Sequence, residues 1–267
     1  MTGSLKRGSV AIRLRVLGCY GGKEPRRNLT SFLLNDVLLV DAGAAASALT
    51  PEEQVRLEAV VLSHAHLDHV GELPFLADNI FGCKGSSLKL VSVQPVLEDV
   101  KRHLLNDRIW PDFTALSAGS CPALELMAIE EGVEHQVGGV GLMAVEVNHV
   151  VNAVGYIFQD DSGGIVYTGD TGPTERLWEY ARSVEDLRAI LIEVSFPDRL
   201  RKVAESAKHL TPRMLQAEIR KMPPDVPIYL HHIKPRFYDE VIEEVKRLGE
   251  PRIQVLVQGE TYEFGRD

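Results

Sequence analysis

One stretch of the sequence, SHAHLDHVGE at residues 63–72, constrains what this chain can fold into more than any other. It places His64, His66, Asp68 and His69 within six positions, directly after the apolar run LEAVVL, which is typical of a buried strand. Neutral imidazole and carboxylate groups bind zinc, which takes about four such ligands. The stretch therefore predicts a metal site at the end of a strand. A solvated, histidine-rich turn is the alternative interpretation.

The spacing within this stretch favours two metal ions over one. His64 and His66 are two residues apart, so a loop that leaves a strand can direct both side chains inward. Asp68 and His69 are adjacent and, at the start of a helix, would face in a different direction. Paired ions roughly 3.5–4 Å apart are a known arrangement for displacement reactions at phosphorus or at a carbonyl carbon.

Further candidate ligands lie at the ends of other apolar runs. The run AVEVNH ends at His149, IVYTGD ends at Asp170, and IYLHH ends at His231 and His232. A single histidine is more often structural than functional. Because three separate strand ends offer His, Asp and His, we expect these side chains to meet at one edge and to complete the metal site.

The order of the predicted elements indicates the fold class. Residues 9–18 alternate as a strand through Val10, residues 31–43 form a hairpin around Asn35-Asp36, and Thr50-Pro51 begins a helix. Buried strands and amphipathic helices then alternate, and the second half repeats this order, with a helix capped by Thr211 and Pro212. Two sheets packed face to face with helices outside fit this order. We expect one α/β domain over residues 1–267.

Composition and charge exclude several classes of function. The net charge of −9 argues against broad, charge-driven binding of nucleic acid. The three cysteines are far apart and odd in number, so they predict neither a disulfide framework nor a CxxC site. The N-terminal MTGSLKRGSV lacks a signal-peptide core, and no apolar run approaches the roughly 18–20 residues of a membrane span. We expect a cytoplasmic protein that binds neither a membrane nor, stably, nucleic acid.

These motifs together resemble the metallo-β-lactamase superfamily. The resemblance rests on LLVDAG with Asp41, the HxHxDH signature of residues 64–69, His149, TGDTG with Asp170, and the late histidine. It implies a four-layer αββα sandwich with the metals at one edge of the two sheets. It also implies two divalent metal ions, with Zn²⁺ expected and Mn²⁺ or Fe as alternatives.

The resemblance also implies how the ligands divide between two sites. Site one would comprise His64, His66 and His149, and site two Asp68, His69 and the late histidine, with Asp170 bridging both. Asp41 would fix the tautomer of a ligand histidine. In relatives the late ligand directly precedes an apolar residue such as Ile233, so we choose His232, and strand alternation would direct His231 the other way.

Six short segments narrow the resemblance to class II cyclic nucleotide phosphodiesterases and their bacterial relatives. They are LADNIFG (76–82), LLNDRIWPDFT (104–114), YTGDTGP (167–173), IEVSFPDRL (192–200), KHLTP (208–212) and HIKPRF (232–237). The resemblance implies hydrolysis of a 3′,5′-cyclic nucleotide to the 5′-nucleotide by a hydroxide that bridges the metals. Asp68, Asp170 and His209 would be catalytic, with Asp170 or His209 protonating the leaving oxygen. A histidine in the same HxT context contacts phosphate in the related ribonuclease Z enzymes.

The substrate-binding residues are less well defined by the sequence. Trp110 and Phe113 could stack on a purine, or they could fill the core. The phosphodiesterases often carry a small residue where this chain has Glu72, whose carboxylate could reshape the pocket near Asp68 or point to solvent.

Three other hypotheses compete with the hypothesis of a cyclic nucleotide phosphodiesterase. A ribonuclease Z-like nucleic-acid phosphodiesterase would need a basic platform. A lactone or thioester hydrolase would need an apolar acyl pocket and a tyrosine near the metals, for which Tyr167 and Tyr229 are candidates. A metal-stabilised binding protein would be expected to lose some ligands. We expect a small-molecule substrate, and a homodimer could form through the regions of Trp110 and Trp178.

Overall fold

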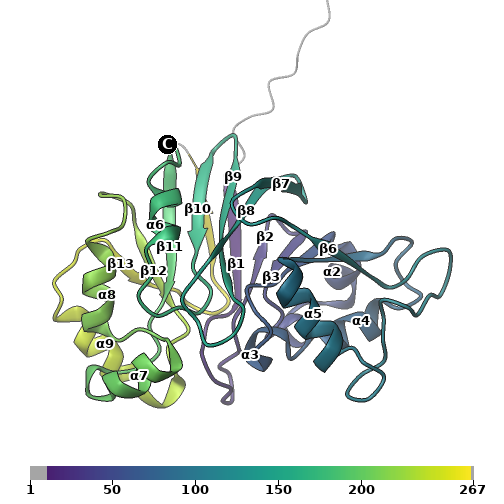
Figure 1. The fold of residues 1–267 in the computed structure, drawn as a ribbon, viewed down its shortest axis with the longest axis horizontal. Helices are drawn as coiled ribbons and strands as arrows, with labels where there is room; N and C mark the ends of the chain where they lie inside the picture. The colour runs from purple at the N-terminus through teal and green to yellow at the C-terminus, as the bar shows by residue number, and fades with distance from the viewer. Residues whose placement is uncertain (1–10, 266–267) are drawn as a thin grey trace, which may run out of the picture.

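Most strands of this chain are buried on both faces, which requires cover on both sides of a sheet. The computed structural model describes residues 11–265 and meets this requirement with two sheets packed face to face and helices on their outer faces (Figure 1). The predicted four-layer αββα sandwich is therefore confirmed. The single-domain assignment of residues 1–267 stays a prediction, and Val10 lies outside the described residues.

The first sheet has the order β14-β1-β2-β3-β4-β5-β6. Its pairs are antiparallel from β14 to β3 and parallel from β3 to β6. The strands are β1 (Ile12–Gly18), β2 (Ser31–Leu34), β3 (Leu38–Val40), β4 (Ala59–Val61), β5 (Leu88–Ser92), β6 (Leu124–Ala128) and β14 (Thr261–Phe264).

The second sheet repeats this arrangement in the order β7-β8-β9-β10-β11-β12-β13, antiparallel as far as β10 and parallel beyond it. Its strands are β7 (Glu134–Val137), β8 (Val140–Glu146), β9 (Val154–Asp160), β10 (Gly163–Tyr167), β11 (Leu187–Glu193), β12 (Ile228–His231) and β13 (Ile253–Val255). The carboxyl ends of β10, β11 and β12 therefore meet at one edge, where α/β proteins commonly bind ligands.

Three buried layers of side chains hold the sandwich together. The layer between the sheets contains Phe32 of β2, Tyr156 of β9 and Tyr167 of β10. The outer layers follow from the alternation of the same strands: Leu33 packs under the helices of the first half, and Val166 under those of the second. Figure 1 shows α2, α4 and α5 on one side of the sheets and α6, α8 and α9 on the other.

The helices are short. They are α1 (Ala45–Ala48), α2 (Pro51–Arg56), α3 (Leu67–Val70), α4 (Leu73–Ile80), α5 (Gln94–His103), α6 (Arg176–Ala181), α7 (Arg201–Ala207), α8 (Pro212–Ile219) and α9 (Tyr238–Lys246), with 3₁₀ turns η1 (Asp198–Leu200) and η2 (Pro235–Phe237). Among the described residues, no helix is long and apolar enough to cross a membrane.

The predicted helix caps have different outcomes. At α2, Thr50 and Glu53 form a complete capping box, as the sequence predicts. At α8, Thr211 occupies the N-cap position, but its side chain makes no capping hydrogen bond and its buried hydroxyl has no partner. Asp198 replaces it, because its Oδ1 accepts the N–H of Arg213 at 2.9 Å. The predicted positions of Thr211 and Pro212 at the start of α8 are therefore confirmed, although the capping hydrogen bond comes from Asp198.

Candidate metal centre

The histidine-rich stretch forms the turn that links β4 to α3. His64 lies three residues after β4 ends, and His66 is the residue before α3 begins. Asp68 and His69 lie in the single turn of α3, so the two pairs approach the site from different directions. This is the arrangement that their spacing predicts.

The other candidate ligands come from strand ends of the second sheet. His149 lies three residues after β8, and Asp170 three residues after β10. His232 follows β12 directly and has a left-handed backbone, with φ +60°. His231, the last residue of β12, turns instead into the layer between the sheets, where its ring lies 5.7 Å from that of Phe32. This placement favours His232 over His231.

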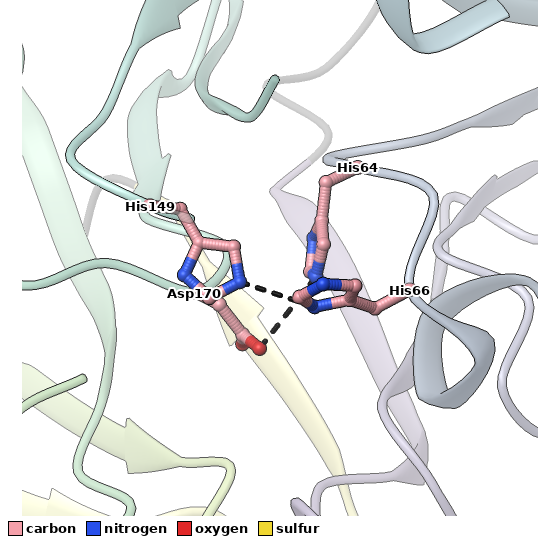
Figure 2. Close-up of side chains that lie close together, drawn as sticks. All are labelled: His64, His66, His149 and Asp170. Carbon is pink, nitrogen blue, oxygen red and sulfur yellow. Dashed lines mark hydrogen bonds and ion pairs between the residues drawn. The ribbon is translucent and has the colours of Figure 1, made fainter. Parts of the chain in front are cut away.

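The structure brings all seven predicted metal ligands into two adjoining groups. His64, His66, His149 and Asp170 form one group, and Asp68, His69, Asp170 and His232 form the other. Within each group, the potential ligand atoms all lie within 4.8 Å of one another. Figure 2 shows the first group, in which the imidazole rings and the carboxylate converge on a common centre.

Asp170 belongs to both groups and is almost completely buried. Its Oδ2 lies 3.7 Å from Nε2 of His64 and 3.1 Å from Nε2 of His232. Its Oδ1 lies 3.3 Å from Nε2 of His69. The carboxylate is therefore placed between the two groups, as a bridging ligand would be.

The histidine nitrogens that face away from the centre have polar side chains as hydrogen-bond partners. Nδ1 of His69 lies 2.7 Å from Asp41, Nδ1 of His232 lies 2.8 Å from the hydroxyl of Thr30, and Nδ1 of His64 lies 3.0 Å from that of Ser63. Such contacts fix the tautomer and the ring orientation, and leave Nε2 free for a ligand.

Divalent cations fit this set of donors. Nε2 of His64, His69 and His232 and Oδ1 of Asp170 are buried without a hydrogen-bond partner, which is costly unless another group satisfies them. Nε2 of His149 lies 3.1 Å from Nδ1 of His66. Two nitrogens bound tetrahedrally to one zinc ion at 2.0–2.1 Å would be about 3.3 Å apart.

The electrostatics of three of the proposed histidine ligands agree with this interpretation. Burial lowers the pKa of His149 to about 4 and holds the pKa values of His64 and His232 well below their usual range, so these imidazoles are neutral, as metal ligands must be. Burial also lowers the pKa of His69, but the charges of Asp170 and Asp41 outweigh it and raise that pKa well above its usual range. A positive charge is thus favoured between these two carboxylates.

His209 lies at the edge of the two groups. Its ring is 5.2 Å from that of His149 and stacks on that of His232 at 5.6 Å. Nδ1 lies 2.6 Å from Oε1 of Glu193, the last residue of β11. Burial lowers the pKa of His209, but the charge of Glu193 outweighs burial and the pKa is raised. The second nitrogen of a protonated His209 remains available as a donor.

Glu72 does not contribute to the metal centre. Its carboxylate accepts hydrogen bonds from the N–H of Ser47 at 2.8 Å and from the Ser47 hydroxyl at 2.8 and 2.9 Å. It therefore anchors α1 and neither reshapes the pocket at Asp68 nor points freely to solvent.

The aromatic residues require corrections. Phe113 is 3% exposed and packs on Phe81 at 5.5 Å, so it has no face to offer a base. The ring of Trp110 contacts Phe75 at 5.2 Å, and no ring contact or hydrogen bond joins it to the metal groups within residues 11–265. Trp178 is fully buried, with its Nε1–H donating to Glu218 at 2.8 Å, so its own side chain is not exposed to a second copy of the chain.

The two tyrosines considered for a lactone hydrolase are also placed elsewhere. Tyr167 is 1% exposed, and its hydroxyl donates to Asp41 at 2.6 Å. Tyr229 packs against Tyr262 and Phe264 in the layer between the sheets, with ring distances of 5.4 Å. The hydroxyl of Tyr167 is therefore engaged by Asp41, and the ring of Tyr229 belongs to the layer between the sheets.

Comparisons with known proteins agree with this geometry. A family model described as "Beta-lactamase superfamily domain" matches residues 36–232, well over half of the chain. The chain belongs to the metallo-β-lactamase superfamily. It is therefore a hydrolase of this fold, and phosphodiesterases are among its relatives.

Individual members of the superfamily show how far the similarity extends. The chain is 26% identical to a 3′,5′-cyclic-nucleotide phosphodiesterase of Aliivibrio fischeri over 76% of this chain and 73% of that protein. It is 27% identical to a ribonuclease of Thermus thermophilus, over 60% of this chain but 32% of that protein. The crystal structure of unliganded yeast PDE1 superposes with a TM-score of 0.81 at 20% identity, covering 96% of this chain and 99% of that chain.

Sequence reasoning missed several residues that support the site. Glu193 is not among the residues predicted for the site, although a charged residue inside the apolar run AILIEVSF is a signal, because a buried carboxylate needs a partner. Thr30 and Ser63 carry no such signal. Their roles depend on which histidine nitrogen each hydroxyl meets in the fold.

Proposed function

We propose that this chain is a dinuclear metal phosphodiesterase that hydrolyses 3′,5′-cyclic nucleotides to 5′-nucleotides. The observation that carries the proposal is the position of Asp170, whose two carboxylate oxygens face both ligand groups. In this proposal His64, His66 and His149 hold one ion, Asp68, His69 and His232 hold the other, and Asp170 bridges them. The seven-ligand, histidine-rich set favours Zn²⁺, with Mn²⁺ or Fe as alternatives.

When bound, two divalent ions would supply Lewis acidity toward the phosphodiester and a strong nucleophile at neutral pH. The chain's own residues provide the rest. Hydrolysis forms one new P–O bond with water and breaks the bond between phosphorus and the 3′ oxygen, so the leaving oxygen needs a proton.

In this proposal His209 supplies that proton. Glu193 accepts the hydrogen bond from Nδ1, which orients the ring and favours the imidazolium form. The proton on Nε2 can then pass to the departing 3′ oxygen. Asp68 is the one carboxylate of the two groups with a substantial exposed fraction, 26% of its side chain, so it can receive the proton lost by the attacking water.

The relatives support a phosphodiesterase, and two of them point to different substrates. One is a cyclic-nucleotide phosphodiesterase and the other a ribonuclease. A small cyclic nucleotide as substrate and a cytoplasmic location are parts of the proposal. A homodimer through the regions of Trp110 and Trp178 also stays a prediction.

The test is a hydrolysis panel on the purified protein. The panel contains 3′,5′-cAMP, 3′,5′-cGMP, a 2′,3′-cyclic nucleotide, bis(p-nitrophenyl) phosphate and a homoserine lactone. The proposal predicts the highest kcat/KM for a 3′,5′-cyclic nucleotide. Preferential cleavage of the 2′,3′-cyclic nucleotide or of the lactone would contradict the proposed substrate, whereas cleavage of the generic diester alone would retain only the phosphodiesterase centre.

A further inference from the structure

Lys234 is a half-buried cation two residues after the proposed ligand His232. Its ammonium donates to the carbonyl oxygen of Gly21 at 2.6 Å and lies 5.7 Å from the centre of the Phe196 ring. No carboxylate within residues 11–265 forms an ion pair with it. Because an ammonium has three N–H donors, the Gly21 carbonyl leaves two of them for a ligand.

The two groups that contact this ammonium lie against the rings at the metal centre. A Cβ on Gly21 would lie 2.8 Å from Nε2 of His232, the nitrogen that faces Asp170 at 3.1 Å. The ring of Phe196 lies 5.8 Å from that of His209. Since the rings of His209 and His232 stack on each other at 5.6 Å, the ammonium lies at the rim of the second ligand group.

The charge of Lys234 acts on both of these rings. Burial lowers the pKa of His232, and the positive charge of Lys234 lowers it further. Burial and the charge of Lys234 also lower the pKa of His209, although the charges of Glu193 and Asp170 outweigh them. These effects agree with an ammonium close to the two rings, because a charge shifts a neighbouring pKa over a short distance.

The fold fixes the position of Lys234 from both sides. The N–H of Gly21 donates to the carbonyl oxygen of Ile233 at 3.3 Å, and the guanidinium of Arg27 donates to that of Pro235 at 2.8 Å. The loop before β2 and the turn η2 therefore hold each other on either side of the lysine. A ligand would meet a cation that is already in place, which reduces the entropic cost of binding.

The charge of Lys234 lacks a counter-charge that the chain could supply from the neighbouring strand end. The buried carboxylate there, Glu193, accepts hydrogen bonds from the ring of His209 at 2.6 Å and from the hydroxyl of Ser195 at 2.9 Å. A partly buried charge without an opposite charge is costly. An anion bound at the metal groups would remove that cost.

We propose that the ammonium of Lys234 binds a non-bridging oxygen of the substrate's phosphodiester. The ligand class is a phosphate ester anion whose phosphorus lies at the metal groups. Lys234 would stabilise the charge on this oxygen during displacement, while His209 faces the departing 3′ oxygen. The ammonium keeps its protons throughout. This inference rests on the proposed phosphodiesterase function and adds a residue that contacts the substrate.

The test measures binding of inorganic phosphate to the purified, metal-containing protein by isothermal titration calorimetry. Lys234→Gln keeps an N–H donor for the Gly21 carbonyl oxygen but removes the charge, and should weaken binding about tenfold. Lys234→Arg keeps the charge and should bind phosphate within about threefold of the wild type. Raising the salt concentration should weaken binding to the wild type more than to Lys234→Gln.

A matched control and two further measurements exclude an indirect effect. Lys23 is an exposed lysine on the same loop, whose ammonium donates to Asn28 at 3.0 Å, and Lys23→Gln should leave the affinity unchanged. Elemental mass spectrometry should find the wild-type metal content in every variant, and thermal melting would verify each fold.

A measurement on the wild type keeps the inference testable even if Lys234→Gln does not fold. Saturating phosphate should slow the acetylation of Lys234 by acetic anhydride about tenfold, as peptide mass spectrometry would show, and leave that of Lys23 unchanged. A Lys234 that reacts equally with and without phosphate, or not at all in its absence, would overturn the contact.

Assaying 3′,5′-cAMP hydrolysis on the same wild-type sample separates this inference from the proposed function. Phosphate affinities within twofold for the wild type and Lys234→Gln, or loss of metal from Lys234→Gln, would overturn the role of Lys234. Hydrolysis of cAMP in that case would leave the proposed function standing. A wild type that binds no phosphate would also overturn the role. A tenfold loss confined to Lys234→Gln supports it even if cAMP is not hydrolysed.

Discussion

Nδ1 of His209 lies 2.6 Å from Oε1 of Glu193, and both side chains are buried beside the candidate metal centre. Glu193 is held in turn by the N–H of Thr171 at 3.1 Å and by the hydroxyl of Ser195 at 2.9 Å. The pair is therefore fixed by the fold. Glu193 can therefore orient His209 and favour its protonated form without being a metal ligand itself.

The first prediction concerns this pair. Glu193→Gln keeps the shape and one acceptor oxygen but removes the charge that raises the pKa of His209. Turnover should fall about 10- to 100-fold, because a neutral His209 is a poor proton donor. Metal content, measured by mass spectrometry of the elements, should stay at the wild-type level. Loss of metal would mean that Glu193 acts through the ligand groups instead.

The second prediction separates a ligand from a proton donor. His66→Ala removes a nitrogen 3.1 Å from that of His149 and should abolish metal binding and activity together. His209→Ala should retain the metal while turnover falls about 10²–10⁴-fold. Elemental analysis and steady-state rates on both variants decide between the roles. If His209→Ala also loses the metal, the assigned role of His209 is wrong.

The third prediction concerns the loop that covers His232. A Cβ on Gly21 would lie 2.5 Å from the carbonyl oxygen of His232 and 2.8 Å from its Nε2. Gly21→Ala should therefore displace His232 and lower both metal content and turnover. Gly85→Ala is the matched control, because a Cβ at Gly85 meets nothing within 4 Å. Equal metal content in the two variants would show that the loop yields without moving the ligand.

The fourth prediction tests the role of Tyr167. Tyr167→Phe removes the hydroxyl that donates to Asp41 at 2.6 Å and leaves the ring in the core. The free energy of unfolding should fall by about 1.5–3 kcal/mol, the usual contribution of a hydrogen bond to a charged group. Urea unfolding measures this loss, while turnover should change only a few-fold. Complete loss of turnover with normal stability would instead indicate a catalytic role for Tyr167.

The fifth prediction concerns cysteine reactivity. Burial raises the pKa of the Cys19 thiol to about 12, so almost none of it is thiolate at pH 8. Cys83 is exposed. Iodoacetamide at pH 8 should modify Cys83 in the folded protein and Cys19 only after denaturation, as peptide mass spectrometry would show. Comparable labelling of both residues before denaturation would contradict the buried position of Cys19.

Much of the fold and of the ligand constellation could be predicted because local patterns carry it. The apolar run before His64 predicts a strand and contains β4, and strand ends bring His149, Asp170 and His232 to one edge. Asp41 was predicted to support a histidine and contacts His69 at 2.7 Å.

The rest depends on tertiary packing, which one sequence does not specify. Phe113 and Trp178 are aromatic residues whose burial is set by helices packed over the sheets, so sequence alone could not distinguish core from surface. Glu72 accepts a hydrogen bond from Ser47 because α1 and α4 lie side by side. The short strands β6 and β7 lacked a clear alternating pattern and were not predicted.

The central claim is that Asp170 joins two metal ions into one phosphodiesterase centre. The most direct measurement determines metal stoichiometry and the product of 3′,5′-cAMP hydrolysis on the same sample, before and after chelation and on adding metal back. The account predicts two ions per chain and formation of 5′-AMP, with rate and metal content lost and restored together. A stoichiometry of one, 3′-AMP as product, or hydrolysis that survives complete removal of metal would contradict it.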